Sequence, residues 1–479
     1  MFIMTIRHYK IRRVVFLACI FVCMALCSLE TKSQVPQGKG YDVDLFTIGV
    51  LNNVEIDMPD SIWESFLVNA DKKENHVCDV TINGERFKNV AIRTKGASSL
   101  DDVKLMGSDR YSFMLALNKY KKGQKYHGLS KISLNNNIWD ATQMKDYIVY
   151  DMCRFIGLPA PLANYTKVML NGRYFGCYLL VEPVAKNFCE RNYPDEVSNI
   201  YKPYHNLAYT GENMDDYKDI SSFAKVNGDD RSMRRIVDAL RSVDTGADID
   251  KHVDVECLMK YMALQTIAVN FDCMTGKNTQ NYFLREAGGR ISLIPWDYNL
   301  AWGGYPDEDE DDFTGPTEGQ DWNKWFESLT QEMRDSLQEA KKKEITKIVN
   351  FPIDTPFTTD LSKRTFFMKL LANEEYKARY YHYLTVLAKD YILGGEFKKA
   401  VSVINQEIGA IVSTEKNAFY TKEQYEKAVE TFLTVLEKRA DSVLGQINGD
   451  IPKTWDSQAS NPQKLIGCEG ININDLGGI

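Results

Sequence analysis

Four oxygen-bearing side chains stand close together in the sequence, in an order that suits phosphoryl transfer. Asp272 comes first, Asn278 and Asn281 follow shortly after it, and Asp297 closes the stretch. Phosphoryl transfer needs one carboxylate to orient the attacking hydroxyl and oxygen ligands to hold Mg²⁺. Asp272 fits the first role, and Asp297 with Asn278 or Asn281 fits the second. Asp and Asn also cap helices and turns, so a structural role is the alternative.

The elements around these residues would place both carboxylates at the ends of secondary structure. Apolar residues recur at helical spacing over residues 256–268, so Asp272 follows a predicted helix. Residues 281–284 and 291–294 are predicted strands joined by a Gly-Gly turn, so Asp297 follows a strand. Side chains at element ends can point into a cleft while a rigid scaffold lies behind them.

Several motifs resemble those of the CotH family, the atypical kinases related to spore-coat protein H. Each motif is modestly specific, whereas the ordered set over roughly residues 45–450 is strongly so. Besides Asp272, the matching segments are residues 92–99 (IRTKGASS), 128–137 (GLSKISLNNN), 157–161 (GLPAP), 170–178 (LNGRYFGCY), 181–184 (VEPV), 281–284 (NYFL) and 294–304 (IPWDYNLAWGG). This resemblance implies a kinase-like fold that binds ATP and Mg²⁺. It implies that Asp272 is the catalytic carboxylate and that Asp297 binds the metal.

The small-residue loop after the strand at 87–93 is a candidate for the phosphate side of the site. Gly96, Ser98 and Ser99 could bring backbone N–H groups and hydroxyls close to phosphates. Arg93 and Lys95 are possible cationic contacts beside this loop. A plain turn is the alternative interpretation of the same residues.

Three further residues are candidates for the nucleotide site through the resemblance. Lys131 could supply the cation near the β- and γ-phosphates, although a lysine on a strand edge often only protects that edge. Asp146 could pair with the phosphate lysine, or be a solvated acid in the first turn of a helix expected over about residues 141–156. Glu182 could lie on the adenine side or bridge two lobes, or be a surface residue before a proline. The strand at 111–118 departs from the family pattern, because Met114 and Ala116 stand where basic residues usually alternate.

The pattern of elements predicts an α+β, atypical protein-kinase-like fold with a β-rich N-terminal part, a mixed core and a C-terminal helical subdomain. The clearest strand signals are two predicted hairpins that turn at Asn83-Gly84 and Asn171-Gly172. The predicted divisions are a signal peptide at 1–27, a linker at 28–43, a β-rich lobe at 44–188, a core lobe with Asp272 and Asp297 at 189–350, a helical subdomain at 351–450 and a tail at 451–479.

The N-terminus is typical of an export signal. Basic residues precede a short apolar run that ends at Cys27. We therefore expect a periplasmic, cell-surface or secreted protein, with membrane anchoring only through a lipid on Cys27. The net charge of −8 comes without a basic stripe, so nucleic acid is not an expected partner.

The expected activity is transfer of the γ-phosphate of ATP to Ser or Thr of a protein substrate. The rival is a non-catalytic surface or adhesion protein that keeps the same scaffold, since extracytoplasmic ATP is scarce and Met114 and Ala116 replace basic residues. Walker-A, His-Glu-x-x-His and Gly-x-Ser-x-Gly motifs are absent from the sequence, which disfavours P-loop, zinc-protease and α/β-hydrolase activities.

Overall fold

The computed structural model describes residues 40–276, 278–305, 344–358, 361–412 and 414–479, together with residues 328, 330, 331 and 333. The predicted leader with Cys27, and the linker as far as residue 39, lie outside the described residues. The last residues of that predicted linker are already helical, in α2 (Tyr41–Phe46). The expected mixture of helix and strand is confirmed.

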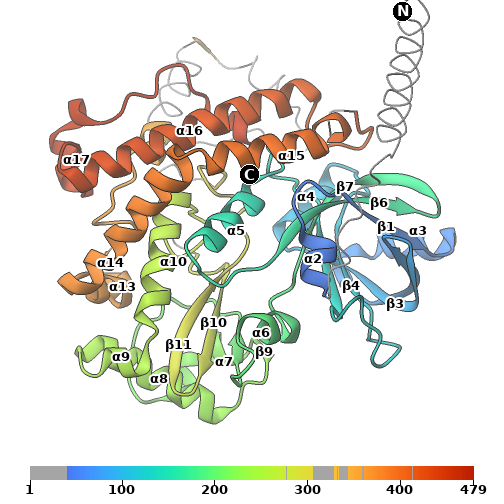
Figure 1. Ribbon diagram of the computed structural model, residues 1–479, viewed down its shortest axis with the longest axis horizontal. Coiled ribbons are helices and arrows are strands. Elements are labelled where there is room, and N and C mark those ends of the chain that lie inside the picture. The colour runs from blue at the N-terminus through green and yellow to red at the C-terminus, as the bar shows by residue number, and fades with distance from the viewer. Residues whose placement is uncertain are drawn as a thin grey trace, which may run out of the picture.

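A closed barrel occupies the N-terminal part of the described chain (Figure 1). Its strand order is β1-β2-β3-β4-β5-β7-β6, and parallel pairing of β1 with β6 closes it. The strands are β1 (Asn52–Asp57), β2 (His76–Ile82), β3 (Glu85–Lys95), β4 (Ser112–Ala116), β5 (Lys131–Asn135), β6 (Ala163–Leu170) and β7 (Arg173–Val181). Both predicted hairpins are present, as β2–β3 and β6–β7. Their Asn-Gly turns have positive φ at both residues, which matches the right-handed twist of the strands.

Apolar residues fill the barrel, and short helices close it. Trp63 and Phe66 of α3 (Asp60–Val68) pack on Phe113 inside the barrel, with ring centroids 5.8 and 6.0 Å from it. Two further short elements flank the strands, namely η1 (Ala70–Lys72) and α4 (Ser98–Leu105). Aromatic rings in such offset and edge contacts contribute beyond the area that they bury.

A second sheet of order β11-β10-β8-β9 lies to the lower left of the barrel in Figure 1 and leads to the segment that carries Asp297. Its strands are β8 (Asn199–Tyr201), β9 (Ala224–Val226), β10 (Tyr282–Ala287) and β11 (Arg290–Pro295). Helix α10 (Val255–Ala268) packs on β11 and is buried along most of its length, because it lies between this sheet and the C-terminal helices. The side chain of Asp254 caps α10 by accepting from the Cys257 backbone N–H at 3.1 Å.

The helix before the barrel's last hairpin begins later than its sequence pattern predicts. Asp140 precedes a predicted helix over 141–156, whereas α5 spans Lys145–Phe155. Gln143 has φ +61° and breaks the helical path. The Asp140 carboxylate instead holds the intervening turn, accepting from the backbone N–H groups of Thr142 and Lys145.

The C-terminal part is helical, as its apolar spacing predicts. In Figure 1, α15 and α16 run side by side above the rest of the molecule. The elements are α13 (Thr365–Leu371), α14 (Glu374–Thr385), the π-helical η5 (Val386–Leu393), α15 (Glu396–Val412), α16 (Lys422–Asn448) and α17 (Trp455–Ser460), with 3₁₀ turns η4 (Leu361–Arg364), η6 (Pro462–Lys464) and η7 (Ile473–Leu476). The remaining helices of the middle region are α6 (Lys186–Asn192), η2 (Met214–Tyr217), α7 (Lys218–Ser221), α8 (Asp230–Thr245) and α9 (Ile249–His252).

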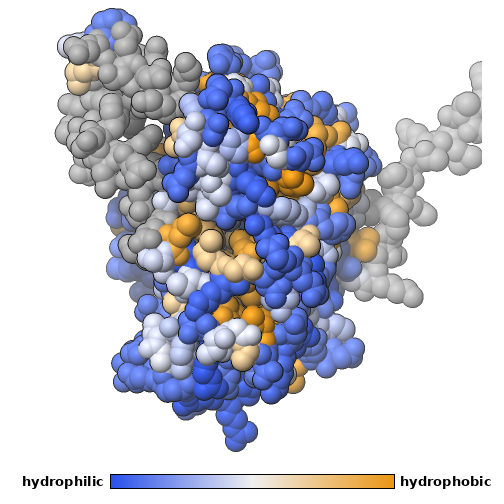
Figure 2. All heavy atoms as spheres, turned by 90° about the vertical axis from the view of Figure 1, so that its left-hand side faces the viewer, coloured by the Kyte–Doolittle hydropathy of each residue, from blue (hydrophilic) through white to orange (hydrophobic). Residues whose placement is uncertain are grey.

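Apolar side chains of these helices face inward. Phe366, Phe367 and Leu370 of α13 are buried. Figure 2 shows the left-hand side of Figure 1, where hydrophilic residues dominate and hydrophobic ones form small separate patches. Within the described residues no helix is both long and apolar enough to cross a membrane. The seven cysteines of the described chain are buried and form no disulfide with one another.

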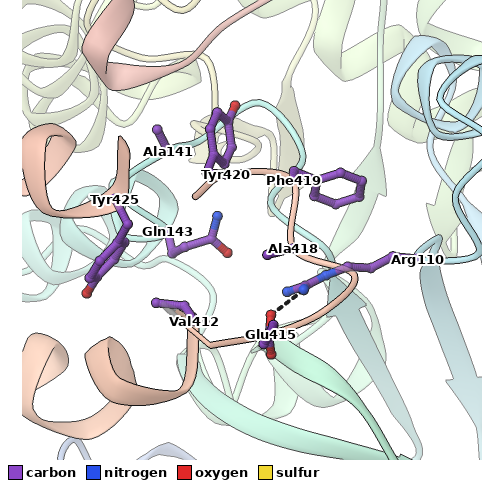
Figure 3. A pocket seen from close by; sticks show the side chains of 9 residues that line it. All are labelled: Arg110, Ala141, Gln143, Val412, Glu415, Ala418, Phe419, Tyr420 and Tyr425. Atoms are coloured by element: carbon purple, nitrogen blue, oxygen red, sulfur yellow. Dashed lines mark hydrogen bonds and ion pairs between the residues drawn. The ribbon is translucent and has the colours of Figure 1, made fainter. Parts of the chain in front are cut away.

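The turn between α15 and α16 joins the helical part to the barrel. Glu415 in this turn forms a buried ion pair with Arg110, and Figure 3 shows the two side chains facing each other beside a cavity of about 10 Å³. The Glu415 carboxylate also accepts from the Tyr174 hydroxyl and, at 2.5 Å, from the Cys177 backbone N–H. A buried carboxylate with three donors gives this joint a defined geometry.

Candidate functional site

The Asp272 carboxylate is held by three neutral amide groups. Asn278 Nδ2 and Gln280 Nε2 donate to its Oδ1 at 2.8 and 2.7 Å, and Asn281 Nδ2 donates to its Oδ2 at 2.8 Å. Burial raises the pKa of Asp272, the nearby charge of Asp297 raises it further, and the three amide donors oppose this rise. The carboxylate is therefore fixed in position while its basicity stays above that of an exposed aspartate.

The turn that carries Asp272 is tied directly to Asp297. Helix α10 ends at Val269, a β-branched residue in the left-handed region with φ +44°. The buried Asn270 follows; its Oδ1 accepts from the Asp272 backbone N–H at 3.1 Å, and its Nδ2 donates to the Asp297 carbonyl at 3.1 Å. Strained backbone held by such contacts is a feature of functional sites.

Asp297 lies two residues beyond the end of β11, after Trp296, and also has a positive φ, +66°. Its backbone N–H donates to the Tyr150 hydroxyl at 3.2 Å, and the next N–H, of Tyr298, donates to Asp146 Oδ1 at 2.6 Å. Both contacts come from α5, so this helix sets the path of the chain after the strand. Within the described chain no hydrogen bond or ion pair reaches the Asp297 carboxylate, which leaves its oxygens available.

Lys95, the last residue of β3, faces the two carboxylates of Asp146 and Asp297. Its Nζ donates to Asn135 Oδ1, and Asn135 Nδ2 donates to Asp146 Oδ2 at 3.4 Å. Burial lowers the pKa of Lys95 to about 8, against the attraction of Asp297 and Asp146. Burial and the charge of Asp297 raise the pKa of Asp146 to about 7. Lys95 thus neutralises a site that would otherwise hold uncompensated carboxylates.

Further cations approach Lys95 from the second sheet and from β3. Lys95 and Lys202 lie over the same ring, that of Trp296, with their Nζ atoms 5.9 and 6.0 Å from its centroid. The charges of Lys202 and Arg93 lower the pKa of Lys95 further. The pKa of Lys225 is also lowered, mainly by burial and in addition by the charges of Lys202 and Arg93. Such a concentration of positive charge favours a polyanionic ligand.

The predicted small-residue loop follows Lys95 without a break. Gly96 has φ +113°, and a Cβ on it would lie 2.5 Å from Ser99 Oγ, so the loop's shape requires glycine. Ser98 and Ser99 form the first turn of α4. This loop is therefore positioned by the same strand that carries Lys95.

Two of the predicted residues are not brought to this group. Lys131 is exposed at the start of β5, whereas Asn135, which contacts Lys95, is at its other end, roughly 13 Å along the strand. Glu182 is fully buried and forms an ion pair with Arg191 at 2.6 Å. It also accepts from the Tyr41 hydroxyl at 2.5 Å, so its carboxylate is engaged within the fold.

The oxygen atoms present fit a hard divalent cation. Asn278 and Asn281 use their Nδ2 groups on Asp272, and within the described chain their Oδ1 atoms take part in no hydrogen bond. Together with the available Asp297 carboxylate they form a carboxylate–amide donor set of the kind Mg²⁺ prefers. No cluster of three or more His, Cys, Asp or Glu suited to a metal occurs in the described part of the chain.

The structure adds residues that sequence reasoning missed. Asn135 lies inside the quoted motif at 128–137, but nothing in the sequence shows which Asn faces the lysine. Gln280 lies between the two predicted Asn residues, in a segment too irregular for a side-chain direction to be inferred. Lys202 lies over the same ring as Lys95, and Lys225 lies near Lys202 and Arg93, through the pairing of short strands for which the sequence has no local signal.

Comparison with known proteins gives a consistent family assignment. The family model "CotH kinase protein" matches residues 92–443, well over half of the chain. Inner spore coat protein H of Bacillus subtilis (strain 168) is 23% identical over 190 residues, which cover 37% of this chain and 51% of that protein. The match thus spans about half the length of this curated relative.

Among solved structures, a complex of HipA, HipB and operator DNA from Shewanella oneidensis MR-1 contains a chain that is 14% identical. The alignment covers 71% of this chain and 59% of that chain, with a TM-score of 0.28, a value too low to support an argument about fold or function.

The matched region contains Asp272, Asp297, Lys95 and Asp146 themselves. It also carries the ordered motifs through which the sequence resembles CotH proteins. The chain therefore belongs to the CotH kinase protein family.

Proposed function

We propose that this protein is an exported kinase-like phosphotransferase that uses Mg·ATP to phosphorylate Ser or Thr of a protein substrate. The observation that carries the proposal is the grouping of Asp272, held by three amides, with the available Asp297 carboxylate and with Lys95, which Asn135 links to Asp146. Membership of a kinase family supports the same reaction class.

Asp272 is the residue that would orient the acceptor hydroxyl. Its amide contacts fix the direction of both oxygens, and its raised pKa makes it a better proton acceptor than an exposed aspartate. In the transfer, the acceptor oxygen forms a bond to the γ-phosphorus while the bond from that phosphorus to the β–γ bridging oxygen breaks. The hydroxyl proton passes to Asp272, and ADP leaves with the bridging oxygen.

Asp297, with Oδ1 of Asn278 or Asn281, would hold Mg²⁺. When bound, the ion would neutralise charge on the phosphates and keep their oxygens aligned. Lys95 would contact phosphate oxygens, and Asp146 would help to orient that lysine through Asn135. Arg93, Lys202 and Lys225 would add charge neutralisation for the triphosphate. These three cations offset the missing basic residues of β4, so Met114 and Ala116 do not by themselves favour a non-catalytic scaffold.

Export is the second part of the proposal. The basic residues and the apolar run before Cys27 support it, and the related Bacillus protein is named for the spore coat. Mass spectrometry of protein purified from the producing cells should show loss of the leader, with a diacylated Cys27 if processing follows the lipoprotein route. Intact Met1 on cytoplasmic protein would contradict export.

Titration calorimetry and a labelled-phosphate assay on mature protein test the enzymatic part. The expected result is Mg²⁺-dependent ATP binding, with label incorporated into the protein itself or into an added extract of exported proteins. Wild-type protein that neither binds Mg·ATP nor labels any protein would favour the scaffold function instead.

A further inference from the structure

The last residues of the chain lie between the two segments that carry the candidate site. Figure 1 places the C-terminus beside α5. The Ala141 backbone N–H donates to the Leu476 carbonyl at 3.2 Å, and the Ile479 N–H donates to the Gly304 carbonyl at 3.1 Å. We call residues 473–479 the C-terminal strap. Its middle contacts the turn before α5, and its two ends contact the chain beyond Asp297.

The strap passes through a slot that admits only glycine. A Cβ on Gly477 would lie 2.6 Å from the Tyr420 hydroxyl and 2.8 Å from both Ala141 N and the Trp139 carbonyl oxygen. A Cβ on Gly478 would lie 2.7 Å from the Gly304 carbonyl oxygen. Contacts this short with backbone atoms cannot be relieved by moving a flexible side chain, so the close approach is a requirement of the fold.

The middle of the strap leads to Asp146. The buried Lys145 donates from Nζ to the Gly477 carbonyl at 3.4 Å, and its own backbone N–H donates to Asp140. The next residue is Asp146, which accepts from the Tyr298 N–H and faces Lys95. Movement of the strap would therefore shift the first turn of α5, where Asp146 is located.

The two ends of the strap lead to Asp272. Ile473 is buried against Gly303, where a Cβ would lie 2.7 Å from Ile473 Cγ1. Gly304 is followed by Tyr305, whose hydroxyl accepts from Asn278 Nδ2 at 2.9 Å. Asn278 in turn donates to Asp272. The strap is thus connected through hydrogen bonds and packing to both Asp146 and Asp272.

We propose that the C-terminal strap is a positioning element of the active site, holding the segment after Asp297 against the first turn of α5. The proposal rests on the proposed phosphotransfer function. The strap lies outside the residues 92–443 matched by the family model, so this role does not follow from the family. Gly477 and Gly478 are positioning residues, because they act through Asp146 and Asn278.

Gly477→Ala in the full chain tests the proposal, with Gly470→Ala as a matched control. Gly470 also has a positive φ, +78°, but a Cβ there would meet nothing within 4 Å. Comparing the two variants therefore separates the effect of the steric clash at residue 477 from the effect of backbone strain. Hydrogen exchange of residues 297–305 and 140–148 should become roughly tenfold faster only in Gly477→Ala. The Kd for Mg·ATP, measured below the melting temperature, should rise by roughly tenfold or more, because small displacements of positioning groups are costly.

Three outcomes decide between the possibilities. A folded Gly477→Ala protein with the exchange rates and Kd of Gly470→Ala would overturn the proposal. A lower melting temperature with unchanged Kd would also overturn it, because the strap would then only stabilise the fold. If wild-type protein binds no Mg·ATP, the phosphotransfer proposal fails. The difference in hydrogen-exchange rates between Gly477→Ala and Gly470→Ala then decides by itself whether the strap holds the two segments.

Ile479→Pro keeps the test available if Gly477→Ala does not fold. Ile479 is 56% exposed, so its replacement leaves the core intact while it removes the N–H that donates to Gly304. Exchange at residues 303–305 should then become faster. Unchanged exchange in this variant would overturn the proposal.

Discussion

Replacing each of the two site aspartates by asparagine should separate their roles, and the structure predicts opposite effects on stability. In Asp272→Asn the new side chain offers one acceptor oxygen where three amide groups donate at 2.7–2.8 Å. Its own NH₂ group must face at least one of these donors. An unsatisfied buried polar group costs about 1–3 kcal/mol, so the free energy of unfolding should fall by about that amount.

Asp297→Asn should leave stability within about 0.5 kcal/mol of wild type, or raise it. The described chain donates no hydrogen bond to this carboxylate, and its charge raises the pKa of both Asp146 and Asp272. Removing that charge relieves repulsion of Asp146 and Asp272, which offsets the lost attraction to Lys95, and it sacrifices no hydrogen bond of the described chain. Urea unfolding of the two variants beside wild type measures both free energies.

The two substitutions should also differ in which step of the reaction they impair. Asp297→Asn should weaken Mg·ATP binding, because a ligand that carries negative charge is lost. Asp272→Asn should bind Mg·ATP nearly as wild type does but lose phosphotransfer by roughly two or more orders of magnitude. Calorimetry and the labelled-phosphate assay are done on variants first shown to be folded. Equal stability losses of about 1 kcal/mol, with nucleotide binding unchanged in both, would mean that the two aspartates are only capping residues.

Three further predictions follow from single sites. Gly96→Ala should cost roughly 1–3 kcal/mol of stability, because residue 96 has a positive φ and the new Cβ would contact Ser99. The substitution should also lower the affinity for Mg·ATP. Unchanged affinity in a folded variant would mean that the loop is a plain turn. Burial raises the pKa of Glu407 to about 7, above its unfolded value, so wild-type stability should fall as pH rises from about 4.5 through 7. Glu407→Gln should remove this loss: melting temperatures should match wild type near pH 4.5 and exceed it at pH 8, and a constant difference across this range would contradict the assignment. Arg439 is fully buried and donates to three backbone carbonyls, so Arg439→Ala should cost roughly 3 kcal/mol in urea unfolding, and a loss below 1 kcal/mol would show that those carbonyls find other donors.

The sequence alone was sufficient to predict features that depend on neighbouring residues. The Asn-Gly pairs specify both barrel hairpins, because few residues accept positive φ at two successive positions. The helix before Asp272 and the hairpin before Asp297 follow from apolar spacing and a Gly-Gly turn. The family also followed from local motifs read in order, and its assignment is confirmed.

Tertiary structure decided which groups meet across the fold. Lys95, at the end of β3, faces Asp146 and Asp297, while Lys131 lies at the far end of β5 from this group; strand register and barrel closure set this difference. Glu182 is engaged by Arg191 and Tyr41, whose positions depend on how α6 and α2 pack. The predicted helix start at about Ala141 was wrong because Gln143 adopts a positive φ, and the Ala141 N–H pairs with the distant Leu476 carbonyl. Such pairings join residues far apart in the chain, so local propensity and periodicity contain no information about them.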